Sequence, residues 1–187
     1  MATMSAPFEN YFTLFRQPIQ FELSQSELDN QLRQLQKQYH PDYVNQEDIK
    51  ARQAAEQASA VINQAYQTLS HPDSRAAYLL TLANQGQNLE QSIADIEFLD
   101  DAMQLRMDLD DAIDSSDAAT LTALKPQIDA RLQAQSKRFL LSYEAGDWET
   151  SIDATQKLKF LVKLAADVAR GLDSVTSQNS DDDDLYV

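Results

Sequence analysis

Both histidines of the chain lie in His-Pro-Asp tripeptides, at residues 40–42 and 71–73. Imidazole and carboxylate groups serve both acid–base chemistry and protein recognition, so the surroundings must decide what each copy does. In the second copy, Pro72 stands where a first helical residue is expected, with Ser70 before it as a cap and Asp73 in the first turn, where the helix dipole favours an anion. We interpret this copy as a helix start.

The first tripeptide lies between two helical patterns. Ser24 with Glu27 three residues later is a capping box, which predicts a helix over about 25–39 that Pro41 ends. After a loop, a narrow apolar stripe predicts a longer antiparallel helix, with the members Ala54, Ala58, Val61, Ile62, Ala65 and Leu69. His40 and Asp42 would then face water at the tip of a hairpin, a position suited to recognition.

Arg33 and Lys37 lie four residues apart on the predicted solvent side of the first hairpin helix. They form a cationic strip in a chain with a formal net charge of −15. Taken alone, the strip fits an ordinary solvated helix face slightly better than a binding surface. Its place next to His40 is what makes it a candidate for binding a protein.

Enzyme signatures are missing from the sequence, which has no glycine-rich phosphate loop, nucleophile elbow or paired-histidine metal motif. The acidic run from Asp108 to Asp114 has no glycine to turn a calcium loop, and we read it as a solvated helix face. The chain has no cysteine, which excludes thiolate ligands for a metal or cluster. We therefore expect no catalytic residue, cofactor or metal site.

The strong negative charge also argues against nucleic acid as a partner, because that affinity depends on cationic groups. No apolar run approaches the ~20 residues of a membrane-spanning helix, and the N-terminus lacks a secretory pattern. We expect a cytoplasmic protein whose partners are other proteins. The acidity is uneven, since residues 1–90 carry a net −4 and residues 91–187 a net −11.

The chain as a whole is expected to be all-α, because it has few of the glycines on which tight hairpin turns depend. The predicted organisation is a disordered start at 1–7, a first domain at 8–84, a linker at 85–94, a three-helix bundle at 95–175 and a disordered acidic tail at 176–187. The last bundle helix carries a seam at alternating three- and four-residue steps. Pro126 should kink or break the middle helix.

The helix expected from Asp95 to Ile113 carries two apolar stripes on nearly opposite sides. One contains Phe98, Ala102, Leu105, Leu109 and Ile113, and it suits the core of the bundle. The other contains Ile96, Leu99, Met103 and Met107. One core needs one stripe, so the second either meets the first domain or forms an exposed protein-binding patch.

These features resemble the J-domain family, whose hallmark is a His-Pro-Asp loop between two antiparallel helices, the first bearing basic residues. The resemblance is closer to the HscB-type co-chaperones of iron–sulfur cluster assembly. It rests on the segments 11–15, 39–42, 62–69 and 72–80, and on 98–106 and 157–164 in the second half. It extends over about residues 10–172, which is nearly the whole expected fold.

The resemblance implies an N-terminal J-domain and a C-terminal three-helix bundle. It implies that His40, Pro41 and Asp42, with Arg33 and Lys37, contact a DnaK-type chaperone of the HscA kind and stimulate its ATPase. The bundle would carry the scaffold protein IscU. The family's scaffold-binding positions fall on Leu99, Asp100, Met103, Gln104, Met107 and Phe160, although Asp100, Gln104 and Met107 differ in character from the family's residues.

Two other interpretations stay open. A J-domain protein could deliver a different client through the same bundle, which would leave the loop function intact. Alternatively, the chain could be a structural or oligomerisation module in which His40 is only a turn residue. Phe160 could likewise be an ordinary surface aromatic, because it lies off the predicted seam of the last helix.

Overall fold

The computed structural model describes residues 9–39 and 49–183, and describes side chains as far as Thr176. The described elements are all helices, which confirms the all-α expectation for this part of the chain. They divide into two compact units, residues 1–83 and 84–187. The first tripeptide, His40, Pro41 and Asp42, lies outside the described residues.

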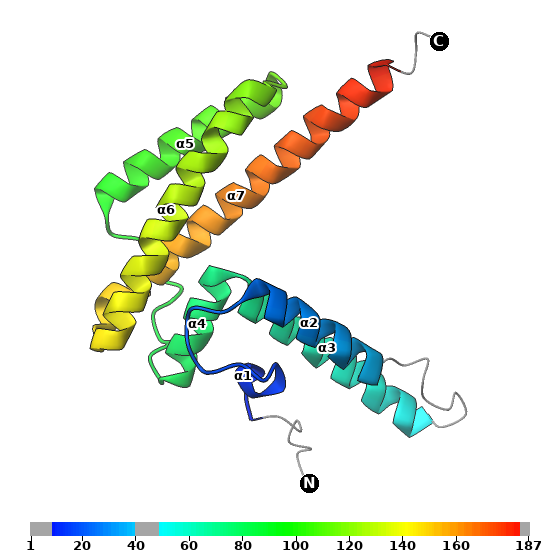
Figure 1. Ribbon diagram of the computed structural model, residues 1–187. Coiled ribbons are helices and arrows are strands. Elements are labelled where there is room, and N and C mark those ends of the chain that lie inside the picture. The colour runs from blue at the N-terminus through cyan, green and yellow to red at the C-terminus, as the bar shows by residue number, and fades with distance from the viewer. Residues whose placement is uncertain (1–8, 40–48, 184–187) are drawn as a thin grey trace. The chain divides into compact units, whose positions relative to one another are not determined.

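The first unit contains a short helix, a two-helix hairpin and a fourth helix, namely α1 (Tyr11–Leu14), α2 (Gln25–Tyr39), α3 (Ile49–Ser70) and α4 (Pro72–Leu82). The helices α2 and α3 lie side by side (Figure 1). They are antiparallel, because Tyr66 near the end of α3 donates a hydrogen bond to Asp29 near the start of α2, over 2.8 Å. The start of α2 confirms the predicted cap, since the Ser24 hydroxyl accepts from the Glu27 amide at 3.4 Å.

Two details of this unit differ from the sequence prediction. Ala55 is buried on α3 and Ala54 is exposed, because Ala55 lies seven residues from Ile62 and shares its face. Ser70 does not cap α4, because its hydroxyl donates to the Tyr66 carbonyl at 2.7 Å and completes α3. The residue before α4 is His71, with Pro72 at the first helical position as predicted.

The second unit is a bundle of α5 (Ile96–Asp114), α6 (Ala118–Ala145) and α7 (Trp148–Asp183). Its helix ends follow local chemistry. Asp95 and Asp117 accept hydrogen bonds from backbone amides in the first turns of α5 and α6, and Gly146 takes a left-handed conformation with φ of 72° after α6. The three helices predicted for the bundle are thus confirmed.

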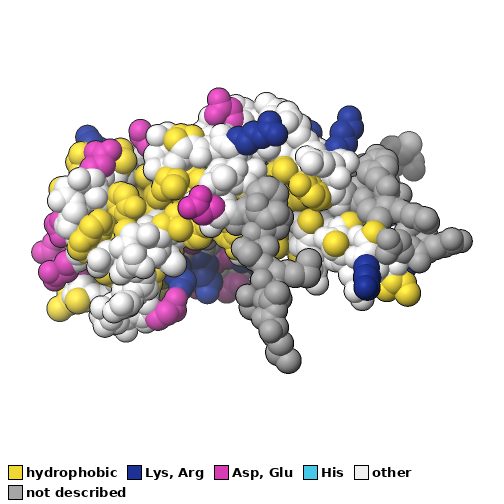
Figure 2. All heavy atoms as spheres, turned by 90° about the horizontal axis from the view of Figure 1, so that it is seen from below, with side chains coloured by type: hydrophobic (Ala, Val, Ile, Leu, Met, Phe, Trp, Pro, Cys, Tyr) yellow, Lys and Arg dark blue, Asp and Glu magenta, His cyan; other side chains and the backbone are white. Residues whose placement is uncertain are grey.

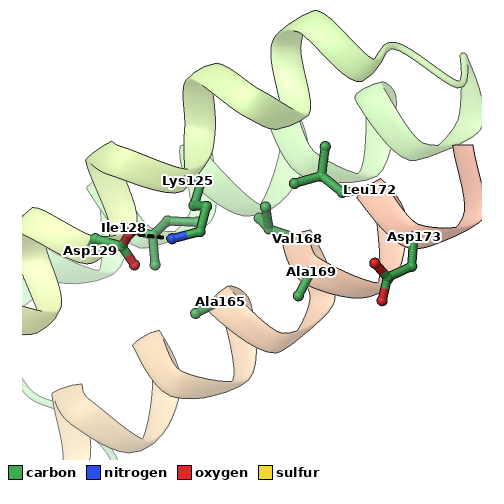
Figure 3. A pocket seen from close by; sticks show the side chains of 8 residues that line it. All are labelled: Lys125, Ile128, Asp129, Ala165, Val168, Ala169, Leu172 and Asp173. Carbon is green, nitrogen blue, oxygen red and sulfur yellow. Dashed lines mark hydrogen bonds and ion pairs between the residues drawn. The ribbon is translucent and has the colours of Figure 1, made fainter. Parts of the chain in front are cut away.

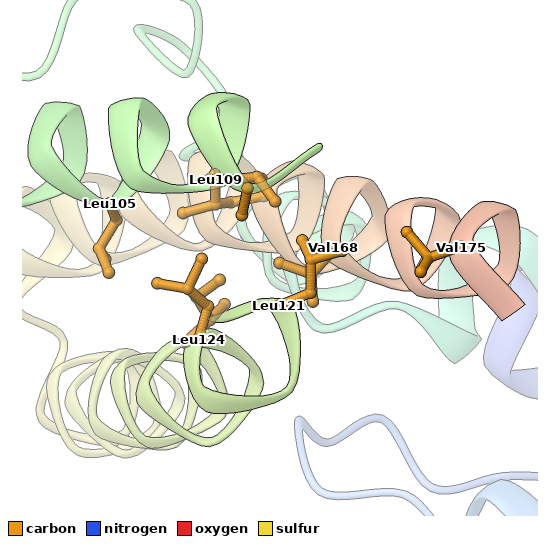
Figure 4. Packing of buried hydrophobic residues seen from close by; sticks show 9 residues of the cluster. Leu105, Leu109, Leu121, Leu124, Val168 and Val175 are labelled. Atoms are coloured by element: carbon orange, nitrogen blue, oxygen red, sulfur yellow. The ribbon is translucent and has the colours of Figure 1, made fainter. Parts of the chain in front are cut away.

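The bundle core combines side chains from all three helices, as Figure 4 shows for Leu105, Leu109, Leu121, Leu124, Val168 and Val175. The predicted seam of α7 supplies its share, with Leu158, Leu161, Val168 and Val175 all buried. Burial of apolar area at this scale is the main favourable term in folding. The core therefore fixes which side of α5 faces inward.

Two features of the bundle helices bear on the sequence predictions. Of the two outcomes expected at Pro126, the break into two helices does not occur, since the remaining backbone hydrogen bonds and the buried Leu121, Leu124 and Ile128 hold α6 as one element. The helix α7 does not end at Val175 but continues to Asp183, into the segment expected to be a disordered tail. Extension of an existing helix needs no new nucleus, which explains the added turns.

Candidate functional site

The inner face of α5 is fixed by the core and leaves the opposite face outside. Ala102, Leu105, Leu109 and Ala112 are buried. Two ion pairs hold the same helix to its neighbours. Arg131 of α6 donates two hydrogen bonds of 2.6 Å to the Asp101 carboxylate, and Arg106 forms an ion pair of 2.5 Å with Asp167 of α7. The orientation of α5 within the bundle is thus fixed by apolar burial and by ionic contacts.

The second apolar stripe of α5 is exposed. Ile96 has 73% of its surface accessible, Met103 has 63% and Met107 has 57%, while Leu99 is partly buried. We call these four residues the α5 apolar row. Exposure of apolar side chains to water is unfavourable, and methionine side chains adapt readily to the shape of a partner. A row of this kind is therefore typical of a protein-binding face. Hydrophobic side chains also reach the surface on the face in Figure 2.

The polar members of the predicted scaffold site flank the row. Asp100 and Gln104 are both exposed on α5, and the Gln104 amide donates to Asp108 over 2.7 Å. Five of the six predicted positions, Leu99, Asp100, Met103, Gln104 and Met107, therefore lie on one helix. The structure places them within three turns of each other, with carboxylate and amide groups beside the apolar surface.

Phe160, the sixth predicted position, lies on α7 and is partly buried. Its ring meets the ring of Phe98 edge to face, with centroids 6.2 Å apart, and it packs against the bundle core. Leu164, one turn later, is buried outright. Phe160 is therefore more than a surface aromatic, because it braces the first turn of α5 from the inner side.

A separate groove lies between α6 and α7, with a volume of about 250 Å³. Figure 3 shows Ala165, Ala169 and Leu172 of α7 facing Ile128 of α6 across it, with the Lys125–Asp129 ion pair of 2.6 Å at its edge. Small alanine side chains leave this space open. None of the predicted scaffold-binding residues lines the groove, so it is distinct from the α5 apolar row.

In the first unit, Arg33 and Lys37 are both exposed on α2 as expected. We call them the α2 basic strip. Arg33 donates to the Asn30 side chain, one turn before it. The hydrogen bond from Tyr66, followed by one from Gln25, holds the pKa of Asp29 below its usual value, so a carboxylate lies one turn from Arg33. The strip thus stands on a helix that is hydrogen-bonded to α3.

The second tripeptide lies at the start of α4, where the sequence analysis placed it. His71 is exposed and its Nδ1 lies 2.9 Å from the Gln67 carbonyl oxygen, while Pro72 and Asp73 open α4. This arrangement confirms helix initiation for residues 71–73. Sequence reasoning missed Phe98 as the partner of Phe160 and gave no role to Lys157, whose burial no local pattern signals.

Within the described ranges, no three His, Cys, Asp or Glu side chains are grouped as metal ligands. A search of those same residues found no helix with the length and apolar character needed to cross a bilayer.

Comparison with known proteins agrees with both units. A family model described as the DnaJ domain matches residues 18–78, and one described as the HSCB C-terminal oligomerisation domain matches residues 94–169. A co-chaperone protein HscB homolog of Acinetobacter baumannii is 36% identical over 177 residues, covering 95% of this chain and 96% of that protein. A homolog from Photobacterium profundum is 39% identical over 163 residues, covering 86% and 95%.

Solved structures give the same result. The chaperone HscB from Vibrio cholerae aligns with a TM-score of 0.72 and 37% identity, covering 89% of this chain and 99% of that one. Human co-chaperone protein HscB aligns with a TM-score of 0.74 at 23% identity, covering 88% and 83%, which supports the fold. Identity above a third across nearly the full length of bacterial relatives extends the agreement beyond fold. The chain belongs to the HscB family of J-domain co-chaperones, which act with a DnaK-type chaperone.

Proposed function

We propose that this protein stimulates ATP hydrolysis by an HscA-type chaperone and delivers an IscU-type scaffold protein to it, in the bacterial cytoplasm. His40, Pro41 and Asp42 contact the ATPase, and the α2 basic strip adds electrostatic attraction. The α5 apolar row binds the scaffold. Hydrolysis takes place in the partner, and the complex promotes cluster transfer and the maturation of iron–sulfur proteins.

The single observation that carries the scaffold half is the exposure of Ile96, Met103 and Met107 on a helix whose other side is fully packed. A bundle of three helices has already satisfied its core with Leu105 and Leu109. Leaving three large apolar side chains in water lowers solubility and brings no stability to the bundle. A partner that covers them removes this apolar surface from water, which favours binding.

The chaperone half is supported by the hairpin and by the strip. Arg33 and Lys37 are exposed in the second half of α2, on the part of the helix that leads towards residue 40. Cations there attract an acidic partner surface and increase its rate of encounter. The His-Pro-Asp tripeptide at 40–42 remains a sequence assignment, which makes it the first target of an experiment.

The chain provides a matched control for that experiment, because it carries the tripeptide twice. The steady-state ATPase rate of the chaperone is measured with the native protein, with His40→Gln and with His71→Gln. Stimulation should be lost in His40→Gln and kept in His71→Gln, since His71 belongs to the start of α4. Equal stimulation by all three proteins would rule out the proposed role of the first tripeptide.

The scaffold half is tested by titrating an IscU-type scaffold with the native chain and with Met103→Ala/Met107→Ala. Phe160→Ala is a less informative variant, because Phe160 also contacts Phe98 and the bundle core and its loss would disturb α5 itself. Weaker binding with an unchanged melting temperature supports the proposal. Native binding by the double variant would show that the row is not the contact.

The description of the matching family as an oligomerisation domain suggests a second use of the bundle, namely self-association. The exposed α5 apolar row would suit a second copy as well as a scaffold. Analytical ultracentrifugation of the protein alone separates the two. A dimer that disappears in Met103→Ala/Met107→Ala would assign the row to self-association, whereas a monomer leaves it for a partner.

A further inference from the structure

Lys157 is a charged side chain in the interior of the bundle. Only 1% of the residue is exposed, which places it among the largest fully buried side chains of the described chain. Burying an ammonium group is unfavourable unless it is paired and hydrogen-bonded. Its Nζ donates to Asp95 Oδ2 at 2.6 Å and to Asp153 Oδ2 at 2.8 Å. It also lies 5.4 Å from the centre of the Phe98 ring.

Asp95 is the residue that starts α5. Its other carboxylate oxygen, Oδ1, accepts from the Phe98 amide at 3.1 Å and caps the helix. The hydrogen bond from Lys157, followed by that from the Phe98 amide, lowers the pKa of Asp95, so the cap stays ionised at neutral pH. One carboxylate therefore joins the first turn of α5 to the middle of α7.

Neighbouring α7 residues hold the chain on either side of this contact. Gln156 donates to the carbonyl oxygens of Asn88 at 3.1 Å and Gln91 at 2.9 Å, and Lys159 lies 3.2 Å from Glu90. One residue further, Phe160 meets Phe98. The exposed pairs are individually weak. Lys157 differs from them because it is buried and acts directly on the residue that sets where α5 begins.

We propose that Lys157 is a positioning residue for scaffold binding, which fixes the start and the rotation of α5 and so presents Ile96 and Leu99 outward. The inference rests on the scaffold role proposed above for the α5 apolar row. At about 100° per residue, Phe98 lies on nearly the opposite side of the helix from Ile96. Holding Asp95 and Phe98 against α7 therefore directs Ile96 away from the bundle.

The alternative is that Lys157 only stabilises the bundle. An apolar side chain of similar length can fill a buried site as well as an ion pair does, often without loss of stability. It cannot hold the Asp95 carboxylate. Lys157→Met therefore separates the two roles, because it keeps the volume at this site and removes the contact that positions α5.

The test uses the full chain with the Lys157→Met substitution and an IscU-type scaffold, and measures scaffold affinity by calorimetry and amide exchange over residues 96–99. We expect binding to weaken about fivefold or more, because a face that is no longer pre-organised must be ordered on binding. Exchange at the Phe98 and Leu99 amides should become faster. ATPase stimulation in the absence of scaffold should be unchanged, since the J-domain is intact.

Ile128→Ala is the matched control, because Ile128 is buried in a core cluster of the same bundle that does not include Lys157, Asp95 or Phe98. The two variants are compared at temperatures that leave equal folded fractions. Selective weakening in Lys157→Met supports positioning. Equal weakening in both, or native affinity in Lys157→Met, would overturn it and leave Lys157 as a stabilising residue.

Asp95→Asn adds a second, independent measurement, since asparagine still caps a helix but lacks the charge that Lys157 binds. If Lys157 acts through Asp95, the double variant Lys157→Met/Asp95→Asn should have a scaffold affinity no lower than that of the single variant with the lower affinity. Additive losses would contradict the proposal. If the native chain binds no scaffold, the scaffold role fails, and the exchange rates over residues 96–99 still decide whether Lys157 sets the start of α5.

Discussion

The two candidate binding faces of this protein differ in chemical character. The α2 basic strip presents two cations in an acidic chain, whereas the α5 apolar row presents uncharged side chains on the more acidic half. Charges act through water over roughly 8 Å at physiological salt, so the strip attracts a partner before contact. Apolar surfaces act only when they touch. We therefore expect the α2 basic strip to affect the rate of association, and the α5 apolar row to affect the stability of the complex once it has formed.

The supports of the two faces differ as well. Among the described residues, α2 is held to α3 by apolar packing and by the neutral hydroxyl of Tyr66 on Asp29. The helix α5 is held by ion pairs to both of its neighbours, through Asp101, Arg106 and Asp95. The bundle therefore depends on ionised carboxylates more than the hairpin does.

The largest expected effect is on scaffold binding, after a charge is introduced into the α5 apolar row. Met107→Asp places a charge within the proposed contact and should weaken scaffold binding by about 2 kcal/mol, roughly thirtyfold, as is usual for a residue that carries much of an interface's binding energy. Leu141→Asp is the control, because Leu141 on α6 is also 57% exposed. Calorimetric titration checks both variants. Equal weakening would show that added charge, and not the position, is responsible.

The next effect concerns the basic strip. Arg33→Glu/Lys37→Glu should weaken binding to the chaperone about tenfold at low ionic strength, mainly through slower association. Surface plasmon resonance at several salt concentrations should show the difference shrinking as salt rises. Lys137→Glu/Lys163→Glu, at exposed positions of α6 and α7, serves as a control with the same change in net charge. A loss that does not depend on salt would mean that the strip makes close, desolvated contacts.

A fall in pH should destabilise the second unit more than the first. Carboxyl groups with lowered pKa values in the folded state stabilise it above their ordinary pKa near 4, and this stability is lost as pH falls through the lowered value. Among the described residues, the first unit has one carboxyl group with a clearly lowered pKa, that of Asp29. The second unit has five, those of Asp95, Asp101, Asp117, Asp147 and Asp167.

We therefore expect the bundle to lose melting temperature more steeply than the hairpin below about pH 4. Asp167 contributes although burial raises its pKa, because hydrogen bonds from Arg106 and Arg170 together outweigh that effect. The one tryptophan of the chain, Trp148, reports on the bundle by fluorescence, and NMR amide signals report on the hairpin. Parallel losses in both units would contradict the comparison.

The smallest effect tests the support of the basic strip. Tyr66→Phe removes the two hydrogen bonds between its hydroxyl and α2, the one donated to Asp29 and the one accepted from Gln25 at 3.1 Å. This should lower the stability of the hairpin by about 1 kcal/mol. The pKa of Asp29 should rise towards its usual value, because the Tyr66 hydroxyl is the largest cause of its depression. An NMR titration of the Asp29 carboxyl measures this shift. An unmoved pKa would show that the hydroxyl does not bind it in solution.

Much of the fold could be predicted because helix ends are local events. The Ser24 cap, Pro72 at a first helical position and the left-handed Gly146 each depend on a few neighbouring residues. The same holds for the two stripes of α5, except that Ala112 is buried at the end of the inner stripe and the predicted Ile113 is exposed. The choice of Ala54 over Ala55 for the inner side of α3 was an error of spacing, because Ala55 lies seven residues from Ile62 and shares its face.

The candidate site divides in the same way. Sequence and family resemblance named the tripeptide at 40–42, the basic strip and most of the α5 positions, and the exposure of Arg33, Lys37, Met103 and Met107 agrees with those predictions. Sequence could not show that Phe160 braces Phe98. It also gave no reason to expect a buried lysine, because lysine is almost always exposed unless it is paired.

The helices, most of their caps, the amphipathic faces and the family could thus be predicted from the sequence, since these depend on residues close in the chain. Which α5 stripe stays in water, and where Lys157 finds its partners, depends on how the helices pack. Lys157 and Asp95 are 62 residues apart in sequence. Burial and ion pairing are properties of neighbours in space, and α5, α6 and α7 must pack before those neighbours exist.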